Sequence, residues 1–80
     1  MHSKQIAYIL LLTAPGKDEK VLDNLRSIPE VSEATLVFGE FDIYAMIEVE
    51  NINELNQVTT KIRKIEGITK TSTLIKSNLK

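Results

Sequence analysis

Polar groups that could hold a small ligand gather in one stretch of this chain, Gly39-Glu40-Phe41-Asp42. The Asp42 carboxylate could accept hydrogen bonds from an ammonium group, and the backbone N–H groups of residues 39–41 could meet a carboxylate. A zwitterion such as a free amino acid needs both partners close together. The alternative is a plain turn, in which Gly39 supplies a positive φ and the aspartate bonds its own backbone.

A second polar set lies near the end of the chain, where Thr71 and Thr73 flank Ser72. Side chains alternate along a strand, so the two threonine hydroxyls should point to the same side and could form a second polar site. Threonine is also common on exposed strands for packing reasons alone. Spacing by itself leaves both interpretations open.

Residue types suited to catalysis or metal binding are scarce. The chain has no cysteine, and its single histidine is His2 beside the N-terminus, so thiolate sites and all-protein zinc sites are not expected. No Ser-His or Cys-His arrangement can be built. Asp42, Tyr44 and Glu48 could act as acids or bases, but no feature of the sequence marks them. We expect no catalytic residue, no metal site and no cofactor.

Length and charge restrict the class of protein. Eighty residues form one domain at most, which we place at residues 1–80. Ten basic and eleven acidic residues give a formal net charge of −1, which argues against a nucleic-acid-binding surface. The longest apolar run, residues 6–12, is far too short to span a bilayer and lacks a secretory cleavage site. We expect a cytoplasmic protein that contacts neither nucleic acid nor membrane.

Hydrophobic periodicity predicts the elements that position these residues. The predicted order is strand 5–13, helix 17–28, strands 32–38 and 41–48, helix 53–65 and strand 68–76. Pro29 cannot continue the first helix. Asn51 or Asn53 can cap the start of the second helix, and Gly67 is placed to end it.

An internal repeat supports this order. A shift of 37 residues carries Ile28 onto Ile65 and Val21 onto Val58. Each copy is a helix that passes through a short turn into a strand. Two such halves form the split βαβ unit of a ferredoxin-like α+β sandwich, βαββαβ in order. Because crossovers are right-handed, both helices should cover the same face of a four-stranded antiparallel sheet.

The other face of that sheet should not lie in water. The first and third strands carry apolar side chains on both sides, unlike a sheet with one solvated face. These strands are central in a ferredoxin-like fold, so a second chain should cover them. We predict a homodimer formed sheet to sheet, a dimeric α+β barrel, with Tyr8, Leu10, Tyr44 and Met46 in the interface. The alternative is a monomer with a solvated apolar sheet.

The motifs taken together resemble one family. The run Pro29-Glu30-Val31 precedes Gly39-Glu40-Phe41-Asp42, and Gly67-Ile68 leads to the Thr71-x-Thr73 pair. This pattern, across residues 6–75, resembles the Lrp/AsnC effector-binding domain, also called the RAM domain.

The resemblance implies dimers formed through the sheets, dimers joined into rings, and a small amino-acid effector bound between dimers. It makes six residues candidate effector contacts: Gly39, Glu40, Phe41, Asp42, Thr71 and Thr73. Most family members carry an N-terminal helix-turn-helix domain, for which the residues before the first strand leave no room. We therefore expect a stand-alone regulatory module that associates with full-length Lrp/AsnC regulators rather than with DNA.

Other functions share this topology. Dimeric α+β barrel enzymes, such as monooxygenases, bind substrate between helices and sheet. Acid–base chemistry there would require a His, Trp or Asn inside the fold, but the single His lies outside it and Trp is absent. The related ACT module also binds amino acids, and it normally pairs side by side rather than face to face. An RNA-binding module of the RRM kind would need a basic third strand.

Overall fold

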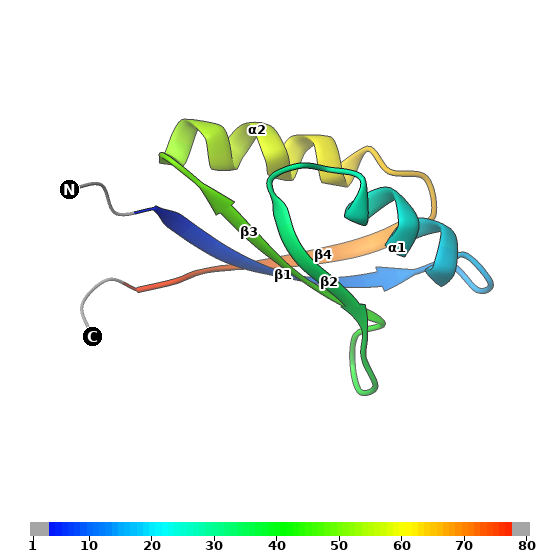
Figure 1. Cartoon of the computed structure of the whole chain (residues 1–80). Helices are drawn as coiled ribbons and strands as arrows, with labels where there is room; N and C mark the ends of the chain where they lie inside the picture. The colour runs from blue at the N-terminus through cyan, green and yellow to red at the C-terminus, as the bar shows by residue number, and fades with distance from the viewer. Residues whose placement is uncertain (1–3, 78–80) are drawn as a thin grey trace.

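The computed structural model describes residues 4–77 and contains one four-stranded antiparallel sheet with both helices on one face (Figure 1). The elements are β1 (Gln5–Thr13), α1 (Asp18–Arg26), β2 (Val31–Leu36), β3 (Ile43–Val49), α2 (Ile52–Arg63) and β4 (Ile68–Ile75). The strand order is β2-β3-β1-β4. The predicted ferredoxin-like fold is confirmed, with β1 and β3 at the centre of the sheet.

The helices are shorter at their C-terminal ends than periodicity predicts. In each, the last predicted turn is a tighter one, in which N–H groups bond carbonyls three residues earlier. These bonds run from Ser27 to Asn24, from Ile28 to Leu25, from Lys64 to Lys61 and from Ile65 to Ile62. The same turn closes both helices, as expected for two copies of one repeated unit.

The start of α2 is capped by Asn51, the first of the two candidates. The Asn51 Oδ1 accepts a hydrogen bond from the Glu54 N–H at 2.8 Å, and the Glu54 Oε1 accepts one from the Glu50 N–H at 3.2 Å. The prediction that Gly67 ends α2 is wrong, because α2 already ends at Arg63. Gly67, at φ +103°, instead turns the chain into β4.

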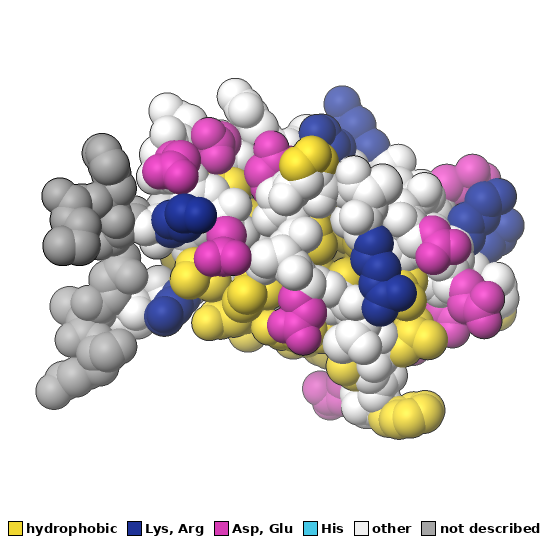
Figure 2. Space-filling view, in the orientation of Figure 1, with side chains coloured by type: hydrophobic (Ala, Val, Ile, Leu, Met, Phe, Trp, Pro, Cys, Tyr) yellow, Lys and Arg dark blue, Asp and Glu magenta, His cyan; other side chains and the backbone are white. Residues whose placement is uncertain are grey.

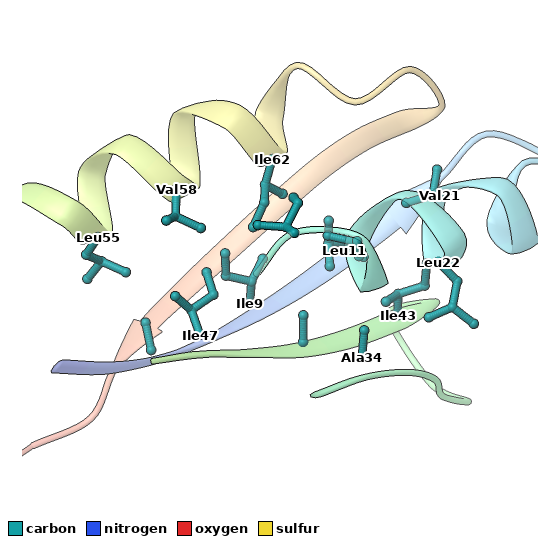
Figure 3. Close-up of a cluster of buried hydrophobic side chains, with 14 of the residues drawn as sticks. Ile9, Leu11, Val21, Leu22, Ala34, Ile43, Ile47, Leu55, Val58 and Ile62 are labelled. Atoms are coloured by element: carbon teal, nitrogen blue, oxygen red, sulfur yellow. The ribbon is translucent and has the colours of Figure 1, made fainter. Parts of the chain in front are cut away.

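The hydrophobic core lies between the helices and one face of the sheet (Figure 3). Alternate residues of β1 and β3 point into it and are almost free of solvent contact, whereas the residues between them are half-buried. The largest fully buried side chains are Ile9, Leu11, Val21, Leu25, Ile43, Ile47, Leu55 and Ile62. Burial at period 2 in the strands and at helical spacing in α1 and α2 confirms which faces the sequence directs inward.

The turn before β4 is fastened to the start of α1 at Gly67. The Gly67 carbonyl accepts a hydrogen bond from the Ala14 N–H at 2.7 Å. A Cβ placed on Gly67 would lie 3.0 Å from the Lys17 Cβ and 3.0 Å from the Val21 Cγ2. Glycine is therefore required both by the positive φ and by the close approach of a buried valine.

We expect Gly67→Ala to lower the free energy of unfolding by about 2–4 kcal/mol, because strain at positive φ adds to crowding of Val21. Gly16→Ala is the matched control, since Gly16 has φ +79° but no atom lies within 4 Å of its added Cβ. The control should lose only about 1–2 kcal/mol. Urea unfolding at equal protein concentration measures both, and equal losses would contradict the packing argument.

Candidate functional site

The Gly39–Asp42 corner lies in the β2–β3 loop, residues 37–42, which extends from the sheet on the side away from the helices (Figure 1). The loop is longer than the connection between the predicted strands 32–38 and 41–48, because the last paired residues are Leu36 and Ile43. A hydrogen bond from the Val37 N–H to the Asp42 carbonyl closes its base at 2.9 Å. The positive φ predicted for Gly39 is confirmed at +131°.

Asp42 ties this loop to the end of β1. Its backbone N–H donates to the Leu11 carbonyl at 2.9 Å. Its side-chain Oδ2 accepts two hydrogen bonds, from the Thr13 N–H at 2.9 Å and from the Thr13 Oγ1 at 3.2 Å. Asp42 is thus held in place by three bonds to one strand, so its carboxylate has a defined position.

Thr13 is a site residue that the sequence analysis missed. The two interpretations of Asp42 were a ligand contact and a bond to its own backbone, and the observed partner is a residue 29 positions away. The antiparallel register of β1 and β3, which sets Leu11 opposite Ile43, brings the end of β1 beside the start of β3. The sequence offers no local signal for this contact, because the contact depends on the strand register.

The second carboxylate oxygen of Asp42, Oδ1, does not bond Thr13. Within residues 4–77, Asp42 Oδ1 accepts no hydrogen bond, and it is not among the buried unpaired atoms of that part of the chain. Asp42 itself is half-buried. The loop therefore presents one anchored carboxylate with an oxygen that remains able to accept hydrogen bonds.

Thr71 and Thr73 lie on the other side of β1 from the loop. They pair with Leu11 and Ile9, so their side chains share the helix-covered face with those core residues, where both are half-buried. Thr71 and Asp42 flank the same end of β1, two strand spacings apart, or about 10 Å.

The other candidate contacts lie elsewhere. Gly39 and Glu40 are exposed in the loop, and Phe41 is half-buried. Residues 4–77 on their own enclose no pocket. The candidate contacts thus fall into two groups, the loop and the β4 threonines, which one chain does not bring together in a single cavity.

The predicted interface residues lie together on the open face of the sheet. Tyr8, Leu10, Tyr44 and Met46 pair across β1 and β3 and alternate with the buried core residues. Figure 2 shows hydrophobic side chains gathered along the side of the molecule opposite α2. All four are half-buried within the single chain.

The two tyrosines of this face stack on one another. Their ring centroids are 6.3 Å apart at an interplanar angle of 20°. Burial, the nearby Glu33 carboxylate and Tyr8 raise the pKa of Tyr44 above its ordinary value. The Tyr44 ring therefore remains neutral on this face at physiological pH, which suits an apolar contact.

Metal ligands do not cluster in the part of the chain that the structure describes: residues 4–77 hold no group of three or more His, Cys, Asp or Glu side chains placed to bind an ion. His2 lies outside the described residues. None of the helices within residues 4–77 is both long and apolar enough to cross a membrane.

Comparisons with known proteins all point to one protein family. Residues 6–78 match the family model of the Lrp/AsnC ligand-binding domain. An uncharacterized HTH-type transcriptional regulator of Pyrococcus abyssi is 33% identical over 76 residues, which are 94% of this chain and 48% of that protein. Regulatory protein AsnC of Haemophilus influenzae is 39% identical over 70 residues, 85% of this chain and 47% of that protein. The chain thus spans about half the length of these relatives.

Solved structures agree with this. A hypothetical protein from Pyrococcus horikoshii is 42% identical with a TM-score of 0.85, and the match covers 91% of this chain and 89% of that one. AsnC of E. coli is 26% identical with a TM-score of 0.83, and the match covers 95% of this chain and 54% of that one. Homocitrate synthase of Sulfurisphaera tokodaii is 38% identical over 53 residues, which are 66% of this chain and 12% of that protein.

We expect Asp42→Ala to lower the free energy of unfolding by about 1–3 kcal/mol even without ligand, because it leaves the half-buried Thr13 N–H without its acceptor. Thr13→Val is the control, since it removes only the weaker hydroxyl bond and keeps the backbone one. Chemical unfolding of the two variants measures the difference. A loss for Thr13→Val as large as that for Asp42→Ala would show that the backbone bond contributes little.

Proposed function

The chain belongs to the family of Lrp/AsnC ligand-binding domains, and on that premise we propose that it is a regulatory module that senses a small amino acid in the cytoplasm. Relatives named as transcriptional regulators support a regulatory role without catalysis. The main structural support is the Asp42 carboxylate. Its Oδ2 accepts two hydrogen bonds from Thr13, and its Oδ1 remains able to accept a hydrogen bond from a ligand. Because this carboxylate is already held in one position, little conformational entropy is lost when a ligand binds to it. Because it is charged, it forms a strong hydrogen bond with an ammonium group.

The proposed site lies between subunits. The β2–β3 loop extends on the same side as the open sheet face (Figure 1), so a second copy packed against that face would lie beside the loop. Such a copy would supply the wall that residues 4–77 lack on their own. Loop N–H groups near Gly39, Glu40 and Phe41 would meet the carboxylate of the amino acid, and Asp42 its ammonium group.

The threonine hydroxyls complete the proposed contacts. Thr71 and Thr73 are half-buried, and no hydrogen bond of their hydroxyls is found within residues 4–77. Because they lie across β1 from Asp42, they reach the same ligand only if assembly brings the loop of one copy near β4 of another. The proposal therefore requires dimers that join into rings, with the effector at their junctions.

The open face supports the homodimer. Burying apolar surface contributes about 25 cal/mol per Å², and Tyr8, Leu10, Tyr44 and Met46 form a contiguous apolar area across the two central strands. A face-to-face contact between two copies would cover all four side chains at once. The same face would allow this chain to associate with a full-length regulator that carries a similar domain.

The match to a segment of homocitrate synthase favours sensing over DNA binding as the shared role. A domain sequence that occurs both in HTH-type regulators and within an enzyme serves some function that both can use. Detection of a metabolite is such a function.

Titration calorimetry with each of the twenty amino acids tests the proposal. We expect at least one to bind with a Kd at or below millimolar, and Asp42→Asn to weaken it at least tenfold. Asparagine keeps an oxygen that Thr13 can bond but removes the charge that attracts the ammonium group. Thr71→Val and Thr73→Val should each weaken binding several-fold.

Thr60→Val is the control for the threonine variants. Thr60 is exposed on α2, away from the proposed contacts on β4. It should bind the effector like the unmodified chain. The sensing role would be contradicted if the assembled protein bound none of the amino acids, or if Asp42→Asn left the affinity for the amino acid unchanged.

The open face has its own test, by light scattering. We expect Leu10→Glu to reduce the assembly to smaller species, because a charge on a buried apolar contact costs several kcal/mol unless it is paired. Ser32→Glu, on the exposed β2 edge, should leave the molar mass unchanged. An unchanged mass for Leu10→Glu would mean that this face is not an interface.

A further inference from the structure

The two edges of the sheet, β2 and β4, differ in whether their outward carbonyl groups are occupied. In an antiparallel pair, alternate residues direct both their N–H and C=O groups toward the neighbouring strand, and the residues between them direct theirs outward. An edge strand therefore presents a row of unpaired groups that can accept another strand.

The β2 edge is blocked by side chains of its own chain. The bond from the Val37 N–H to the Asp42 carbonyl, with the β2–β3 register, leaves Ala34 and Leu36 facing outward. Arg26 donates from Nε and Nη2 to the Ala34 carbonyl at 3.1 and 2.9 Å. The Thr35 hydroxyl lies 3.4 Å from the Leu36 carbonyl and bonds to it. Both of these carbonyls thus accept a side-chain bond and the Arg26 side chain lies across the edge, while the outward N–H groups of Ala34 and Leu36 have no bond within residues 4–77.

The β4 edge has no such side-chain bonds. The Lys76 N–H bonds the Ile6 carbonyl at 2.8 Å, and the register with β1 then directs the groups of Leu74 and Ser72 inward. Thr71, Thr73 and Ile75 face outward. No backbone or side-chain group within residues 4–77 bonds their outward N–H or C=O groups. Two apolar side chains, Leu74 and Ile75, are more than half exposed on this strand.

The geometry points to β4 as a pairing edge: we infer that β4 of one copy hydrogen-bonds antiparallel to β4 of a second copy. Arg26 and Thr35 block β2 in the second copy as they do in the first, so β4 is the edge that remains for it to offer. Two identical strands related by a two-fold axis pair antiparallel, which is the arrangement of an isologous contact. The inference rests on backbone groups and stands independently of the proposed effector.

Charge selects the register of this pair. Outward residues must face outward residues, and the two axes nearest the middle of the outward set Thr71, Thr73 and Ile75 are compared, at Thr73 and at Ser72. An axis at Thr73 sets Lys70 directly opposite Lys76 of the second copy, and like charges in that position destabilise a sheet. An axis at Ser72 sets Thr71 opposite Thr73 of the second copy, a favourable cross-strand pair, and places the Lys70 stem against Leu74. We therefore place Ser72 on the axis.

Cysteine crosslinking tests this register, since the chain has no cysteine of its own. At the axis, Ser72 faces its symmetry mate as a non-hydrogen-bonded pair with Cα atoms about 4.5 Å apart. That spacing suits a disulfide, which needs about 4.4–6.8 Å. Two sheets stacked face to face lie about 10 Å apart, too far for the same bond.

We expect Ser72→Cys to form a covalent dimer under mild oxidation at least tenfold faster than Ser32→Cys, its matched control on the exposed edge of β2. Non-reducing electrophoresis and mass spectrometry measure the dimer. A rate for Ser72→Cys no greater than that of Ser32→Cys would overturn the inference.

Proline substitution provides a second measurement. The Thr73 N–H points outward, so Thr73→Pro removes a group for pairing without breaking a bond to β1. Leu36→Pro does the same on the blocked β2 edge and is the control. Sedimentation should show a lower average mass for Thr73→Pro alone. An unchanged mass for Thr73→Pro would contradict the β4 contact.

Discussion

The structure depends on one strand, β1, which is apolar on both sides and central in the sheet. Right-handed crossovers place α1 and α2 on the same face, so the fold can bury only one side of β1. Ala7, Ile9 and Leu11 are buried there, while Tyr8 and Leu10 remain half-buried on the other side. A small domain buries only about 60% of the surface of its unfolded chain. Assembly with another chain is the means left to cover the second face.

The proposed sensing site is built onto the same strand. Asp42 bonds Leu11 and Thr13 at one end of β1, and Thr71 pairs with Leu11 from the other side. A ligand held by these residues would therefore touch elements that also form the sheet contacts. Because a ligand shifts an equilibrium only by its differential affinity for two states, binding at a junction between copies would give the proposed amino acid direct control over assembly.

Much of the fold follows from short-range patterns, whereas the bonds that define the site do not. The 37-residue repeat predicts the element order, and Asn51 is a cap that spacing alone can identify. Gly67 appears in sequence as a helix end, but the core position of Val21 explains why it must be glycine. The bonds from Thr13 to Asp42 and from Arg26 to Ala34 join different elements. They depend on strand register and helix placement, which local periodicity does not specify.

Sedimentation equilibrium of the unmodified chain tests the central claim most directly. If the second face of β1 must be covered, the protein at about 10 µM should have a molar mass of at least twice the 9.0 kDa of one chain, and dilution should not produce a stable monomer in the micromolar range. A single well-folded 9.0 kDa species across that range would contradict the account.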